Sequence, residues 1–143
     1  DIQAKLLTAI ESHSFRRVGG TVLIKVDVQV IAASNRDLKE MITKGDFRED
    51  LYYRLKVVDL DMPPLRKRKE DIPELVGFFI REYNARQGVN VVNISPQAME
   101  ALQNYPWPGN IRELSNAIER AMLFCDGMTI NLGDLPRDIS SAV

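Results

Sequence analysis

The sequence predicts a mixed α/β segment followed by a bundle of helices. Up to residue 62, stretches in which apolar and polar residues alternate, as in half-buried strands, are interleaved with stretches of helical periodicity. The pair Pro63-Pro64 then ends the second strand-like stretch. Beyond it the pattern is helical, with capping residues and apolar stripes. We therefore expect two parts, 1–64 and 65–143.

Composition and charge exclude several classes of protein. The 143 residues are 45% hydrophobic and 27% charged, as in an ordinary globular domain. Nineteen Lys and Arg against twenty Asp and Glu give a net charge of −1, which argues against a basic nucleic-acid coat, an acidic tail or direct DNA binding. A single cysteine, Cys125, excludes an intramolecular disulfide framework and a multi-cysteine zinc site.

The chain shows no membrane-spanning or targeting segment. Its longest apolar run, 75–80, is far shorter than a membrane span, and it opens on Asp1 without a charged-then-apolar leader. We expect a piece of a longer, soluble and cytoplasmic protein that has no membrane partner.

Five elements are expected in the first part: a helix over 1–13, a strand over 25–33, a helix from Asp37 to just before Gly45, a helix over 47–55 and a strand over 56–62. The third begins at a capping-box pattern, Asp37 with Glu40 three residues later, and Gly45 can end it. The strand over 25–33 becomes apolar on both faces toward its end, which is typical of a covered sheet.

The second part is expected to hold three main helices. The first begins at Asp71, which forms a capping-box pattern with Glu74, and ends before Gly88. The second covers 95–105 and begins at a Ser-Pro pair. The third begins at Asn110, which we expect to cap it together with Glu113.

Several chemistry-bearing residues are better explained without a catalytic role. His13 stands alone at a helix end, and Cys125 lies on an apolar helical stripe. Asp59 and Asp61 share one side of a strand, where ordinary strand polarity accounts for them. The basic run 66–69 is balanced by the acidic pair after it and favours a solvated face, although Arg66 itself, beside the prolines, could point inward.

Three arginines are harder to dismiss. Arg48 and Arg54 are six residues apart, nearly two helical turns, so they could project in roughly the same direction; the alternative is two surface arginines paired with Glu49 and Asp50. Arg112 follows the only tryptophan, two prolines and a glycine, in the first turn of a helix. A cation there opposes the helix dipole, which favours an anionic ligand; the alternative is a salt bridge to a neighbour.

Read in order, six motifs resemble the AAA+ ATPase domain of sigma-54-dependent transcriptional activators, the bacterial enhancer-binding proteins. They are Arg17-Val18-Gly19-Gly20, Ala33-Ser34-Asn35-Arg36-Asp37-Leu38, Phe47-Arg48-Glu49-Asp50-Leu51-Tyr52-Tyr53-Arg54-Leu55, Pro63-Pro64-Leu65-Arg66, Glu70-Asp71-Ile72 and Trp107-Pro108-Gly109-Asn110-Ile111-Arg112-Glu113-Leu114. The resemblance runs from Asp1 to about Asp138. It implies the C-terminal part of an AAA+ α/β subdomain over 1–64 and an all-helical lid over 65–143.

The resemblance also implies roles for particular residues. Ser34 and Asn35 match the sensor I position, which reports on the γ-phosphate and the attacking water. Arg48 and Arg54 match the arginine fingers that a subunit offers in trans to the nucleotide of its neighbour in the ring. Arg112 matches the sensor II arginine of the lid.

Further lid contacts and a moving loop follow from the same resemblance. Arg66, Ile72 and Ile111 match positions near the adenine and the lid, and residues 17–21 match a hairpin loop near the central pore. ATP and Mg²⁺ would be the cofactors of the parent protein, which resembles response regulators that control transcription.

The sequence lacks several parts of the family's module. These 143 residues contain no G-x-x-x-x-G-K-S/T motif, acidic Walker B strand, Gly-Ala-Phe-Thr-Gly-Ala type loop or helix-turn-helix domain. We therefore expect the C-terminal half of the module, with no metal site, no tightly bound cofactor and no ATP turnover of its own.

The parent would reach its partners largely through those missing parts. It would contact sigma-54 RNA polymerase holoenzyme through the missing loop, DNA through a missing C-terminal domain, and copies of itself in a hexameric or heptameric ring. ATP hydrolysis would drive remodelling of the promoter complex. The alternative is a non-catalytic oligomerisation or binding module of a regulatory protein.

Overall fold

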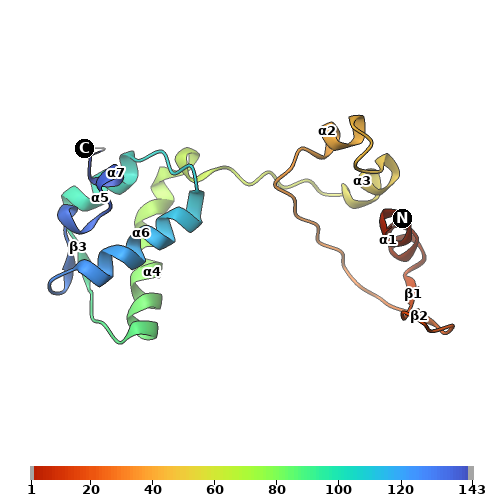
Figure 1. Ribbon diagram of the computed structural model, residues 1–143, viewed down its shortest axis with the longest axis horizontal. Coiled ribbons are helices and arrows are strands. Elements are labelled where there is room, and N and C mark those ends of the chain that lie inside the picture. The colour runs from red at the N-terminus through yellow and green to blue at the C-terminus, as the bar shows by residue number, and fades with distance from the viewer. Residues whose placement is uncertain (1, 142–143) are drawn as a thin grey trace. The chain divides into compact units, whose positions relative to one another are not determined.

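The computed structural model describes residues 2–141, which divide between Asp61 and Met62 into two compact units (Figure 1). Helices make up most of the second unit but less than half of the first, and the described residues of each also hold one small two-stranded sheet. The expected order, an α/β part followed by a helical part, is confirmed.

The first unit begins with a helix that leads into a hairpin. Helix α1 covers Ile2–Ser12, and strands β1 (Ser14–Arg16) and β2 (Leu23–Lys25) pair antiparallel, with Phe15 opposite Ile24. Between the strands, Gly20 N donates to the carbonyl of Arg17 at 2.9 Å, and Gly19 has a φ of +75°. A positive φ is favourable for glycine, so this pair of glycines suits the turn.

Two short helices complete the first unit, α2 (Leu38–Thr43) and α3 (Glu49–Leu55). The Asp37 carboxylate accepts hydrogen bonds from the backbone N–H groups of Lys39 and Glu40, at 2.9 and 3.1 Å, which confirms the predicted start of α2. Gly45, with a φ of +78°, follows the helix and lets the chain turn toward α3.

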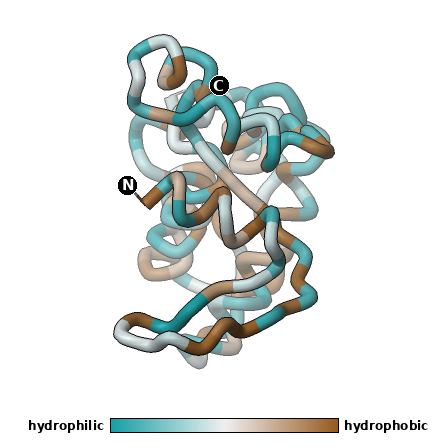
Figure 2. Tube along the Cα trace, turned by 90° about the vertical axis from the view of Figure 1, so that its right-hand side faces the viewer, coloured by the Kyte–Doolittle hydropathy of each residue, from teal (hydrophilic) through white to brown (hydrophobic). Residues whose placement is uncertain are grey.

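The strands predicted over 25–33 and 56–62 are wrong. Apart from Lys25, which ends β2, neither stretch is in a strand, and their apolar side chains are exposed, Ile31 by 86% and Leu60 by 81%. Figure 2 shows hydrophobic and hydrophilic residues alternating along the first of them. Alternation fits a sheet surface, but a strand needs a neighbour to pair its backbone groups. Among the described residues, only the start of the first stretch has one: Lys25 pairs with Ser14, and the N–H of Val26 donates to the His13 carbonyl at 2.8 Å.

Up to residue 141, the second unit is built from four α-helices, three 3₁₀ turns and one pair of two-residue strands. In order they are η1 (Leu65–Lys67), η2 (Lys69–Asp71), α4 (Ile72–Gln87), β3 (Asn93–Ile94), α5 (Pro96–Asn104), α6 (Asn110–Phe124), β4 (Thr129–Ile130), η3 (Leu132–Asp134) and α7 (Arg137–Ser140). Strands β3 and β4 pair in parallel, a contact that the prediction of an all-helical lid left out.

Of the three capping residues predicted for this unit, Ser95 caps its helix, whereas Asp71 and Asn110 do not. Ser95 caps α5 as expected, its hydroxyl accepting from the N–H of Ala98 at 3.3 Å. Asp71 has a helical backbone and makes no capping bond, because the turn η2 runs directly into α4; its carboxylate instead lies 3.7 Å from the Arg68 guanidinium. Gly88 ends α4 with a φ of +70°, as predicted.

One hydrophobic core holds the second unit together. Among the described residues its buried side chains run from Leu65 to Ile139, and α4, α5, α6 and α7 each contribute. Helices α4 and α6 are also joined by polar contacts: the hydroxyls of Tyr83 and Ser115 lie 2.6 Å apart, and Arg86 pairs with Glu119. The first unit is different, because Leu51 is its only fully buried apolar side chain among the described residues.

Candidate nucleotide-facing arginines and their supports

The turn before α2 fixes Ser34 and leaves Asn35 available. The Ser34 hydroxyl accepts a hydrogen bond from Arg36 N at 3.0 Å and donates to the Arg36 carbonyl at 3.3 Å. This local ring shapes the turn that leads to the capping residue Asp37. Asn35 is exposed, and within residues 2–141 its carboxamide has no hydrogen-bond partner. Of the two predicted sensor residues, Asn35 therefore has the side chain free to meet a ligand.

Arg48 lies at the N-cap of α3 and is held by a carboxylate. Its Nε donates to Asp50 Oδ1 at 3.0 Å, and its Nη2 donates to Asp50 Oδ2 at 2.6 Å. The two parallel bonds raise the pKa of Arg48 above its ordinary value and lower that of Asp50. Both side chains are nearly half exposed, so the pair stands in solvent rather than in a core.

Arg54 lies in the last turn of α3, where a cation complements the helix dipole. The prediction that the two arginines project in the same direction assumed that both lie within one helix. Arg48 is instead the N-cap residue and precedes the helix. The two arginines stand at opposite ends of a seven-residue helix, about 10 Å long. Arg54 is exposed and has no ion-pair partner in the described part of the chain. The predicted pairing with an acid therefore holds for Arg48 alone.

The entry to α6 is anchored by Trp107. This residue is fully buried, and its indole Nε1 donates to the Leu102 carbonyl at 2.7 Å. Its ring packs edge-to-face with that of Tyr105, with the two ring centroids 5.0 Å apart. The Trp107 φ of +50° is unusual for a bulky residue, and the packing holds it there. The buried ring fixes where the chain turns into α6.

A polar network then sets the first turn of α6, in a way that differs from the predicted cap. The N-cap is Gly109, whose N–H donates to Glu113 Oε2 at 2.8 Å. Asn110 does not cap: its side-chain oxygen accepts from the N–H of Leu65 at 2.9 Å, which ties η1 to α6. Glu113 Oε1 also accepts from Tyr105 at 3.3 Å, and this carboxylate adds to burial in raising the pKa of Tyr105.

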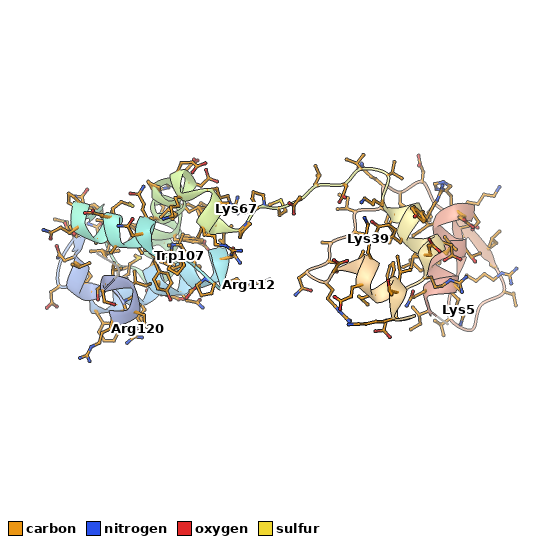
Figure 3. The ribbon with its side chains drawn as sticks, turned by 90° about the horizontal axis from the view of Figure 1, so that it is seen from above. Lys5, Lys39, Lys67, Trp107, Arg112 and Arg120 are labelled. Carbon is orange, nitrogen blue, oxygen red and sulfur yellow. The ribbon has the colours of Figure 1, made fainter. Side chains whose placement is uncertain are left out.

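Arg112 is exposed in that first turn, and Figure 3 shows it at the end of the unit where Lys67 lies. Arg66 precedes Lys67 in η1, which the Asn110 side chain ties to α6. Within residues 2–141, Arg112 has no ion-pair or hydrogen-bond partner. Arg66 is exposed as well. It does not point inward, the orientation that its place beside the prolines had suggested. Cations around the positive end of a helix dipole suit a phosphate.

The two isoleucines predicted near the adenine lie in different surroundings. Ile72 is completely buried in the core of its unit, whereas Ile111 is half-buried and packs against that core from the first turn of α6. Ile111 therefore has surface left for a ligand, and Ile72 has none within this unit.

Residues 2–141 offer neither a cluster of metal ligands nor a membrane-spanning helix. No group of three or more His, Cys, Asp or Glu side chains there could hold a metal ion. None of the helices in that range has the length and hydropathy that crossing a membrane requires.

Family comparisons match both units. Residues 1–61 match the sigma-54 interaction domain, and residues 66–143, more than half of the chain, match the AAA+ ATPase lid domain. The chain belongs to the AAA+ ATPases of the sigma-54 activators. The predicted resemblance to bacterial enhancer-binding proteins is confirmed.

Individual relatives cover almost all of the chain. It is 48% identical to the regulatory protein AtoC of Escherichia coli (strain K12) over 142 residues, and 50% identical to the transcriptional regulatory protein ZraR of Klebsiella oxytoca over 139 residues. These alignments span 99% and 97% of this chain and 31% of each relative. The chain thus corresponds to about a third of the length of these proteins.

Solved structures show the same fold. NtrX from Brucella abortus, crystallised in complex with ATP, superposes with a TM-score of 0.86 at 41% identity, over 99% of this chain and 33% of NtrX. Its ADP complex matches equally well, with a TM-score of 0.86.

Proposed function

We propose that this chain is the C-terminal half of an ATPase module that couples ATP hydrolysis to remodelling of the sigma-54 RNA polymerase promoter complex. The observation that carries the proposal is the order of the two family matches along one chain, a sigma-54 interaction domain and then an AAA+ lid. A transcription activator of this kind works in the bacterial cytoplasm, where promoter DNA is found.

In this proposal Arg48 and Arg54 act on the nucleotide of a neighbouring subunit. Phosphoryl transfer spreads negative charge over the equatorial oxygens of the phosphate, and a permanently charged planar guanidinium stabilises that charge. Arg54 is exposed and ready to make such a contact, whereas Arg48 must first leave Asp50. Supplying the arginines in trans makes hydrolysis depend on assembly of the hexameric or heptameric ring.

Sensor I and the lid would read the phosphates of the same subunit. Asn35, next to the structural Ser34, would hydrogen-bond the γ-phosphate or the attacking water. Arg112 would contact the nucleotide from the exposed end of α6, with Arg66 and Ile111 beside it. The cluster of cations there fits a polyphosphate, and NtrX was crystallised with both ADP and ATP. ATP with Mg²⁺ supplies the phosphoryl group in the parent protein.

The isolated chain should not turn over ATP. A glycine-rich cradle with its lysine would grip the β- and γ-phosphates, and these 143 residues contain no such motif. The alternative role, a non-catalytic oligomerisation or binding module, therefore describes the isolated chain better than an enzyme does. Titration with a fluorescent ATP analogue tests this: we expect weak binding and no phosphate release, and micromolar binding with steady release would refute it.

Finger variants of the full-length activator test the catalytic proposal. Arg48→Ala and Arg54→Ala should each lower kcat by about 10³-fold or more, in the range found for arginine fingers, while nucleotide binding stays largely intact. Arg81→Ala, at an exposed arginine of α4, is the matched control and should keep normal turnover. Normal turnover in both finger variants would remove the assignment.

A further inference from the structure

The side chain of Gln3 bridges two points of the loop that carries Arg48. Gln3 lies in the first turn of α1; its Oε1 accepts a hydrogen bond from the backbone N–H of Arg48 at 2.8 Å, and its Nε2 donates to the carbonyl of Asp46 at 2.9 Å. These residues are more than 40 positions apart in the sequence. One carboxamide therefore clamps the backbone on both sides of Phe47.

The clamp supplies an acceptor at the far end of the loop, where the helix offers none to the backbone N–H of Arg48. Its near end is held by the Met41 carbonyl, which accepts from the N–H groups of Asp46 and Phe47 at 2.9 and 3.3 Å. At its far end Arg48 is an N-cap residue with no capping side-chain bond, and its own N–H lies outside the helical hydrogen bonds of α3. Gln3 provides the acceptor for that N–H.

Packing around α3 is too sparse to replace the clamp. Helix α1 lies beside α3 (Figure 1), but Leu51 is the only fully buried apolar side chain among the described residues of this unit. Polar contacts therefore carry a larger share of the positional restraint here than in the second unit. A small shift of the N-cap residue moves the start of its guanidinium arm directly.

We propose that Gln3 is a positioning residue for the arginine finger Arg48, which it orients by clamping the backbone of residues 46–48. This inference rests on the proposed function, because it requires that Arg48 reach a neighbour's nucleotide. Gln3 touches no reacting atom and acts only through the finger.

The clamp requires both an acceptor and a donor, which predicts how substitutions behave. Glutamate keeps the shape of Gln3 and the acceptor for Arg48, but it sets a carboxylate against the carbonyl of Asp46. Alanine removes both bonds. Both changes should loosen the loop, and Gln3→Glu does so without removing side-chain volume.

The test measures ATP turnover of the full-length activator as its ring. Gln3→Ala and Gln3→Glu should each lower kcat by about ten- to a hundred-fold, as expected when a catalytic group is displaced by around an ångström, with KM changed less than about two-fold. Glu11→Ala, at an exposed residue of the same helix, is the matched control and should leave kcat unchanged. Circular dichroism shows that each variant is folded.

A double-variant comparison separates positioning from general structural damage. In an Arg48→Ala background, Gln3→Ala should cause no further loss of kcat, because the finger it orients is gone. Wild-type kcat in both Gln3 variants, or a loss that multiplies with that of Arg48→Ala, would overturn this inference while leaving the proposed function intact. Normal turnover in Arg48→Ala alone would overturn the finger assignment and this inference with it.

Discussion

Replacing Trp107 should destabilise the second unit, which contains the lid match, more than replacing any exposed aromatic residue of that unit. The indole is fully buried, and it pairs with the carbonyl of Leu102 at 2.7 Å. That carbonyl is in the last turn of α5, where helical partners are missing, so the indole N–H is its replacement.

The structure gives the size of the effect. Trp107→Ala leaves a cavity and should cost about 3–5 kcal/mol of unfolding free energy. Trp107→Phe fills most of the space but leaves the Leu102 carbonyl unpaired, which should cost about 1–3 kcal/mol. Because a domain of this size has a total stability of only about 5–15 kcal/mol, the phenylalanine variant is the one more certain to remain folded.

Urea unfolding of residues 62–143, followed by far-ultraviolet circular dichroism, measures these values, since the core of this unit lies wholly within it. Phe124→Ala is the matched control, because Phe124 is 65% exposed on α6 and should cost less than about 1 kcal/mol. Equal unfolding free energies for Trp107→Ala and Phe124→Ala would refute the anchoring role of Trp107.

Three further predictions concern single contacts. Gly109→Ala should lower the thermal midpoint of the lid by several degrees, since a Cβ there would lie 2.8 Å from Glu113 Cβ; an unchanged midpoint would contradict the packing. Burial raises the pKa of the Cys125 thiol, so at pH 8 iodoacetamide should react more slowly with the folded chain than with the chain in urea, and equal rates would count against it. Pairing with Arg48 lowers the pKa of Asp50, so the stability that this pair contributes is fully present above the ordinary aspartate pKa of about 3.9 and is lost as the pH falls through the lowered value. Carboxyl NMR of Arg48→Ala should show the pKa of Asp50 rising toward about 3.9. No rise would refute the pairing.

Helix ends were predictable from the sequence where their signals are local. Asp37 and Ser95 cap their helices, and Gly88 ends α4 with a positive φ, because each of these residues acts on backbone groups only a few positions away. The same reasoning failed at Asn110. Its side chain is recruited by the N–H of Leu65, 45 positions earlier, and no local pattern shows that competition.

The prediction of strands over 25–33 and 56–62 was wrong for a related reason. Alternating residues over 25–33 and 56–62 indicate a surface that would fit a sheet, yet pairing depends on a neighbouring strand, which the pattern itself cannot supply. Sequence motifs pointed to Arg48, Arg54 and Arg112, and the structure places all three at helix ends. No motif pointed to the clamp by Gln3, since a lone glutamine in an amphipathic helix carries no signal.

Mixed rings test the central claim, that Arg48 and Arg54 serve a neighbour's nucleotide, most directly. One full-length subunit would carry Arg48→Ala with Arg54→Ala, and the other would keep both arginines but have a disabled phosphate-binding lysine in the part of the module that precedes this chain. Each alone should be inactive, and the account predicts that mixing them restores a measurable fraction of ATP turnover. Mixed rings as inactive as either parent would contradict it.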